Sequence, residues 1–183
     1  MVSAMMESLV AVDSNSLSYL VEAMMSGREP AGNLAKQKIA LLRIYLYRTE
    51  ILYMTPSVEC EYKRIRESKR REMHDGAAMV LLGDIQISDY RKVKNRTSEY
   101  SKYHPGMKNR MDCRILAESE LGGCEYLLTY DKEFLSRLKD KTHKIKMTTP
   151  IKFWESLNIP RGTKSIRAPH PTNPLSKEIW WRW

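Results

Sequence analysis

Short apolar runs alternate along this chain with longer stretches in which apolar residues recur at helical spacing, a pattern that predicts strands alternating with helices. The clearest apolar runs are Leu9 to Val12, Ile51 to Met54 and Tyr126 to Thr129, each of the right length for one buried strand. Asn33 to about Arg48 is typical of the helical stretches, with aliphatic residues along one face. This order favours one α/β domain with a mainly parallel central sheet and helices on both faces.

The middle of the chain is more polar than the parts on either side of it. A turn at Pro56 starts a predicted helix that runs through about Glu72. The short apolar run from Ala77 to Ser88 fits either a strand or the end of a helix. Asp89 to about His104 is predicted to be a basic helix.

The composition changes at Asn158, so we divide the chain into a domain of residues 1–157 and a basic tail of residues 158–183. Four prolines in the tail disfavour regular packed structure there. Trp180, Trp181 and Trp183 are too apolar to stay in water. We therefore expect them to dock onto the domain or onto a second subunit of a homodimer.

Four acidic residues that are far apart in the sequence lie near the places where predicted strands and helices meet. Asp13 and Asp131 follow apolar runs, Asp112 opens a helix, and Glu61 follows the turn at Pro56. In an α/β fold such carboxylates can converge at one edge of the sheet. Converging carboxylates repel one another and are tolerated mainly when a divalent cation binds between them. A metal site is the leading hypothesis.

The segments around these acids, VAVDSNSL, PSVECEY, MDCRILAE and YLLTYDKEF, resemble in this order the motifs of the PIN-domain family of metal-dependent nucleases, which includes the VapC-type ribonuclease toxins. The resemblance covers roughly Leu9 to Leu157 and implies a PIN-like three-layer α/β/α fold. It implies that Asp13, Asp112 and Asp131 hold Mg2+ or Mn2+, with Glu61 binding directly or through water. The implied activity is that of an endoribonuclease that hydrolyses RNA phosphodiester bonds with metal-activated water, and the toxin members imply an antitoxin partner.

Two departures from the family pattern leave alternatives open. Glu59 also lies near the expected glutamate position; Glu61 is preferred because its spacing from Pro56 is the usual one, and Glu59 is the reserve. The charged segment from about Arg66 to Met111 is longer than expected in a compact toxin. An RNA-processing or quality-control nuclease without an antitoxin is therefore an alternative.

Two further function classes fit the sequence less well. A non-catalytic RNA-binding PIN module is disfavoured because all four acids are present. A Rossmann-like nucleotide binder or a magnesium phosphatase lacks support because no glycine-rich phosphate loop follows the first strand. Asn15 and Thr129 flank the site acids and either orient ligands or cap strand ends, and Glu118 is a weak supplementary candidate.

The chain has 31 basic and 22 acidic residues, a formal charge of +9, which favours polyanionic partners such as RNA. Eight of the basic residues lie between Asp89 and Arg114: Arg91, Lys92, Lys94, Arg96, Lys102, Lys108, Arg110 and Arg114. Tyr90, Tyr100 and Tyr103 interleave with them, a combination suited to single-stranded RNA. For the tyrosines alone, packing on the core is the preferred interpretation.

The cysteines and histidines do not form a recognisable catalytic or zinc pattern. Cys60, Cys113 and Cys124 have no metal-binding spacing and are interpreted as buried small residues in a reducing compartment. The four histidines are isolated, which disfavours a zinc hydrolase. The first ten residues do not have the pattern of a secretory signal, and no segment approaches the roughly 20 apolar residues of a membrane span. We expect a cytoplasmic protein.

Overall fold

The computed structural model describes residues 8–107 and 109–183. The expectation about a secretory signal falls largely on residues 1–7, and Lys108 of the basic segment also lies outside the described residues. Within the described ranges one sheet has the strand order β3-β2-β1-β4-β5, and all its neighbouring strands pair in parallel. The strands are β1 (Val10–Val12), β2 (Leu52–Met54), β3 (Leu82–Asp84), β4 (Tyr126–Leu128) and β5 (Lys146–Thr148). The predicted parallel α/β fold is confirmed.

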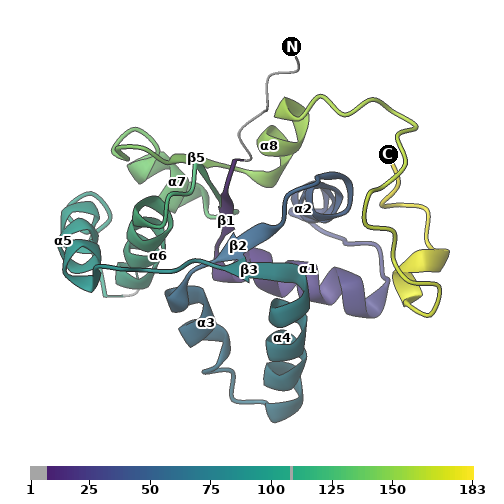
Figure 1. Cartoon of the computed structure of the whole chain (residues 1–183), viewed down its shortest axis with the longest axis horizontal. Coiled ribbons are helices and arrows are strands. Elements are labelled where there is room, and N and C mark those ends of the chain that lie inside the picture. Colours follow the sequence, from purple (N-terminus) through teal and green to yellow (C-terminus); the bar gives the residue numbers. More distant parts are fainter. Residues whose placement is uncertain (1–7, 108) are drawn as a thin grey trace.

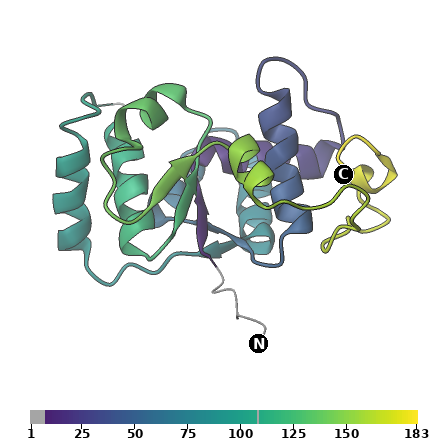
Figure 2. The ribbon, with the colours of Figure 1, turned by 90° about the horizontal axis from the view of Figure 1, so that it is seen from above.

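Helices cover both faces of this sheet. They are α1 (Ser14–Ser26), α2 (Ala35–Tyr47), α3 (Pro56–Tyr62), α4 (Ser68–Leu81), α5 (Tyr90–Tyr100), α6 (Arg110–Leu121), α7 (Lys132–Leu138), α8 (Pro150–Ser156) and the short 3-10 helix η1 (Pro174–Lys177). Helices α2 and α8 lie together on one side, and α1, α3 and α4 lie on the other (Figures 1 and 2). Since strand β1 is central and covered on both faces, its three residues are all buried and apolar.

One predicted helix is divided in the structure. The sequence favoured a continuous helix from Pro56 to about Glu72, but α3 ends at Tyr62 and α4 starts at Ser68. The backbone N–H of Ile65 donates to the carbonyl of Tyr62 at 3.0 Å, so the end of α3 tightens into a 3-10 turn. The apolar run that began at Ala77 contains the end of α4 and then strand β3.

The tail packs against the domain of its own chain. Leu175 of η1 and the Trp181 side chain are buried. The indole N–H of Trp180 donates to the carbonyl of Gly27 at 3.2 Å, and the guanidinium of Arg43 lies 4.8 Å from the ring centre of Trp183. Of the two expected docking surfaces, the tryptophans therefore use the domain.

Gly27 allows this close approach of the tail to α1. It ends α1 in the left-handed conformation, with φ of 64°, where an L side chain is strained. A Cβ atom at this position would also lie 2.9 Å from Pro174. Within residues 8–107 and 109–183, no helix has the length and apolar character of a membrane span.

Candidate functional site

Asp13 lies between β1 and α1 and is buried. Asp13 caps α1: its Oδ1 accepts a hydrogen bond from the backbone N–H of Ser16 at 2.7 Å, whereas Ser14 and Ser16, which could also cap a helix by residue type, do not. The residue before the first turn is the one whose side chain can reach the free N–H groups. Burial raises the pKa of Asp13, while hydrogen bonds from Ser16 and Thr129 act in the opposite direction.

Asp131 occupies the equivalent position after β4. Its Oδ1 accepts from the N–H of Phe134 at 2.9 Å and so caps α7, and its own N–H donates to Oγ1 of Thr129 at 3.1 Å. Strands β1 and β4 pair in parallel, so both aspartates follow the same edge of the sheet, and the charge of Asp131 adds to the pKa rise of Asp13. Thr129 therefore bridges the two acids.

Glu61 belongs to the last turn of α3, and its side chain reaches toward the start of α1. The hydroxyl of Ser14, the residue after Asp13, donates to Oε2 of Glu61. Glu59 instead pairs with Lys63 on the outside of α3. Of the two glutamates, the structure directs Glu61 toward the aspartates.

Asp112 lies in the first turn of α6 and is half-buried. Burial raises its pKa, and the charges of Glu61, Asp13 and Asp131 raise it further, to about 7. The carboxyl of Asp112 is therefore the one on which all the other acids act. The structure brings the four candidates within electrostatic range of one another, and their roles as ligands stay a prediction.

The chemistry of these donors fits a hard divalent cation. Among the described residues, no three acidic, cysteine or histidine side chains lie close enough together to hold a cation as they stand. Mg2+, however, commonly uses one or two carboxylates and fills its remaining positions with water and substrate oxygen. The charges of Glu61, Asp13 and Asp131 make the anion of Asp112 unfavourable. A bound cation would relieve that repulsion.

Other candidates from the sequence lie away from the four acids or serve the fold. Glu118 is fully buried, and its carboxylate accepts from the N–H and the hydroxyl of Ser57, both at 2.9 Å, so it holds the start of α3. Asn15 is exposed. The expectation that all three cysteines are buried is wrong for Cys60, because α3 turns Val58 and Tyr62 inward and leaves Cys60 outside.

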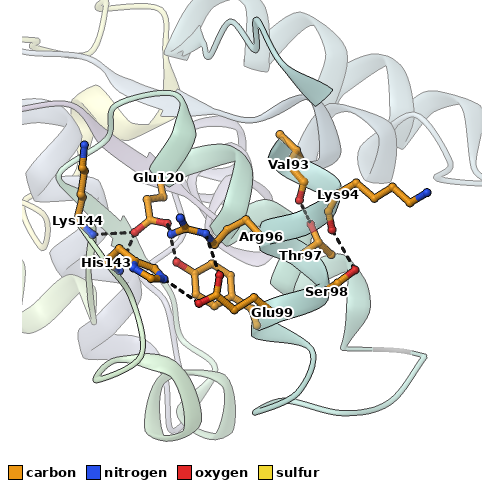
Figure 3. A network of polar contacts seen from close by, with 10 residues as sticks. Val93, Lys94, Arg96, Thr97, Ser98, Glu99, Glu120, His143 and Lys144 are labelled. Atoms are coloured by element: carbon orange, nitrogen blue, oxygen red, sulfur yellow. Dashed lines mark hydrogen bonds and ion pairs between the residues drawn. The ribbon is translucent and has the colours of Figure 1, made fainter. Parts of the chain in front are cut away.

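The sequence did not indicate a polar network that joins α5 to α6. Figure 3 shows Arg96, Glu99, Glu120 and His143 pointing toward one another. The Glu120 carboxylate accepts from the backbone N–H of His143 at 2.8 Å and from the hydroxyl of Tyr100 at 2.6 Å. Tyr100 is therefore a core residue, as preferred, whereas Tyr90 and Tyr103 are 54% and 44% exposed, so core packing is wrong for those two tyrosines. Nothing in the sequence indicated Glu120, since its partners come from two other segments, α5 and residues 143–144.

The comparisons with known proteins leave the description of the fold as it stands. No family model and no curated protein matches the chain. A search of solved structures finds similarity to the crystal structure of FitAcB from Neisseria gonorrhoeae, with a TM-score of 0.45 and 13% sequence identity, covering 78% of this chain and 99% of that chain. At this TM-score the similarity carries no conclusion about activity, and the family resemblance rests on the order of the four acidic motifs.

Proposed function

We propose that this protein is a PIN-type endoribonuclease that depends on Mg2+ or Mn2+. The observation that supports this most strongly is the electrostatic convergence of Asp13, Glu61, Asp131 and Asp112, which come from four separate parts of the chain. A cluster that contains only acidic side chains is rare as a purely structural feature, because repulsion between like charges raises the cost of folding. A bound divalent cation offsets this cost, and such a cation can also bind a phosphate.

The roles of the residues follow from their positions. Asp13, Asp112 and Asp131 would hold the ion or ions, and Glu61 would bind directly or through a water molecule. A bound divalent cation lowers the pKa of water and neutralises charge that develops on the scissile phosphate. Thr129 keeps the two strand-end aspartates in place through its hydroxyl, and Ser14 does the same for Glu61.

The test is cleavage of a structured RNA pool in Mg2+ or Mn2+, with and without EDTA. We expect the chelator to stop cleavage, and Asp13→Asn or Asp131→Asn to reduce it by about 100-fold or more. Asparagine is the right replacement because it also caps helices, so the fold is kept. Glu155→Gln, at an exposed position on α8, is the matched control and should cleave normally. Cleavage that persists in EDTA would contradict the metal mechanism.

Three finer assignments are part of the same proposal and have separate readouts. A toxin would be held inactive by an antitoxin encoded beside it, whereas a processing enzyme would have no such partner. A non-catalytic module would bind RNA without cleaving it in either metal. A homodimer would appear as twice the chain mass of 21.4 kDa in solution.

A further inference from the structure

A groove of about 460 Å³ lies between helices α5 and α6. It is lined by Tyr90, Val93, Lys94, Thr97, Met107, Arg110, Met111 and Arg114. Pockets of this size are large enough for a small ligand or for part of a chain. The groove is therefore large enough to be considered as a binding site.

The lining combines apolar surface, an exposed aromatic ring and positive charge. Val93 and Thr97 are buried in the floor, whereas Tyr90 at the entrance is 54% exposed. Three lining residues are cationic, and none of those in the described part of the chain is acidic. A planar ring beside cations is the arrangement that holds an unpaired base and its phosphates.

Two of the three cations are available for a ligand. Arg114 pairs with Glu118. In contrast, within residues 8–107 and 109–183 no ion pair involves Lys94 or Arg110. Figure 3 shows the contrast on α5 itself: Arg96 points into the Glu120 network, and Lys94 extends away from it. Positive charge without a protein partner attracts phosphate at little cost in desolvation.

The groove and the acidic site share one turn of helix. Met111 lines the groove, and the next residue, Asp112, is the acid on which the other three charges act. A strand that lies in the groove would thus pass the start of α6 on its way to the acids. The same RNA strand could therefore contact the cations of the groove and the proposed site at Asp112.

We propose that the α5–α6 groove binds unpaired nucleotides of single-stranded RNA beside the scissile bond, with a base stacked on Tyr90 and phosphates held by Lys94 and Arg110. This inference rests on the proposed nuclease function and names where its substrate lies. RNA is favoured over a peptide because the groove offers cations without acids and a ring that is open to stacking. The proposal also assigns different roles to neighbouring cations on α5: Lys94 lines the groove, whereas Arg91 and Lys92 do not.

The test measures binding of a short fluorescent single-stranded RNA by anisotropy, in EDTA so that no cleavage occurs. The double variant Lys94→Ala and Arg110→Ala should weaken binding about tenfold and flatten the salt dependence by about 1.4 in log–log slope, 0.7 for each lost phosphate contact. Arg91→Ala with Lys92→Ala removes the same charge from the same region outside the groove and should weaken binding about twofold at most. All four side chains are exposed, so both variants should fold.

The stacking residue has its own matched pair. Tyr90→Leu should weaken binding about tenfold, because the variant loses the stacking free energy of one base on an aromatic ring. The loss should be similar for RNAs of different sequence, since every base can stack. Tyr103→Leu, at another exposed tyrosine beyond α5 that does not line the groove, should bind nearly as well as the parent.

Each outcome decides between the groove and the nuclease assignment. If RNA binds the parent and both double variants equally, the groove proposal is wrong, while cleavage in Mg2+ would still support the nuclease. If the expected losses occur but Mg2+ and Mn2+ give no cleavage, the groove stands and the protein is an RNA-binding module. If a Glu- and Leu-rich peptide binds more tightly than RNA and is lost in the same variants, the groove is a protein-docking site. If the parent binds no RNA, the groove proposal falls.

Discussion

At the scale of single residues, the carboxyl of Asp112 has the most unusual environment among the four acids. Burial and three neighbouring carboxylates raise its pKa from 3.8 to about 7. Because the folded-state pKa lies above the unfolded value, the protonated form favours folding, and the contribution of Asp112 to stability is fully present only below about pH 4. The free energy of unfolding should fall as the pH rises through 7, where the folded protein must hold an unfavourable anion.

Asp112→Asn removes this anion, so in EDTA at pH 8 we expect it to melt above the parent by about 2 to 4 °C. At pH 5 the difference should shrink, because the parent carboxyl is then mostly protonated. Added Mg2+ or Mn2+ should raise the melting temperature of the parent more than that of the variant, since a ligand stabilises the folded state in proportion to its affinity. Melting curves against metal concentration at both pH values measure this.

The opposite result has a definite meaning. A variant that melts below the parent in EDTA, with an equal shift on addition of metal, would show that Asp112 stabilises the positive N-terminal end of α6. It would then have no part in a metal site.

At the scale of elements, the junction of α5, α6 and the segment before β5 depends on Glu120. Burial alone would raise the pKa of Glu120, but hydrogen bonds from Tyr100, Lys144 and His143 lower it below its usual value. A carboxyl with a lowered pKa stabilises the fold above its unfolded pKa, and the contribution is lost as the pH falls through the folded value. The packing of α5 against α6 thus depends on a carboxyl whose pKa is lowered by the groups that it joins.

Glu120→Gln should lower the free energy of unfolding by about 1.5 to 3 kcal/mol at pH 7, because a charged acceptor of several hydrogen bonds is replaced by a neutral one. Glu133→Gln is the matched control, since Glu133 is exposed on α7 and pairs with Arg137 four residues later; it should cost about 0.5 kcal/mol or less. Urea unfolding of the parent and of both variants, at pH 7 and at pH 4, measures these changes in the free energy of unfolding. Equal costs for the two variants would mean that Glu120 does not hold the junction.

At the scale of the whole molecule, the tail is part of the packed structure of the domain. Arg43 of α2 donates to the carbonyls of Trp181 at 3.0 Å and Arg182 at 2.7 Å, so it satisfies backbone groups that have no regular structure of their own. The apolar anchor of the tail is Leu175, which is fully buried beside α1.

Leu175→Ala should cost about 2 to 5 kcal/mol of stability, since it leaves a cavity at a buried position. Ile179→Ala, in the same tail but 73% exposed, should cost about 0.5 kcal/mol or less. Thermal melting and the rate of RNA cleavage measured at a temperature where both variants are folded separate stability from activity. A Leu175→Ala variant that melts like the parent would mean that the tail does not stabilise the domain in solution.

The sequence by itself determined the fold class and the positions of β1, β2 and β4. The apolar run of β1 is readable because a strand covered on both faces has no polar position, and helix faces are readable from their spacing. Local signals also located the starts of α3 and α5, because capping depends on neighbours in the sequence. The break between α3 and α4 was missed because the long mixed-charge stretch gives no local stop signal at Tyr62.

Only the tertiary structure decided which residues meet. The sequence preferred Glu61 to Glu59 only by its spacing from Pro56, and the contact of Glu61 with Ser14 is what distinguishes them in the structure. The same is true of Glu118, which looked like a site residue and instead holds Ser57. Such contacts join positions far apart in the chain and depend on how the elements pack. Local spacing specifies which residues share a face of a helix, but it does not specify which other element packs against that face.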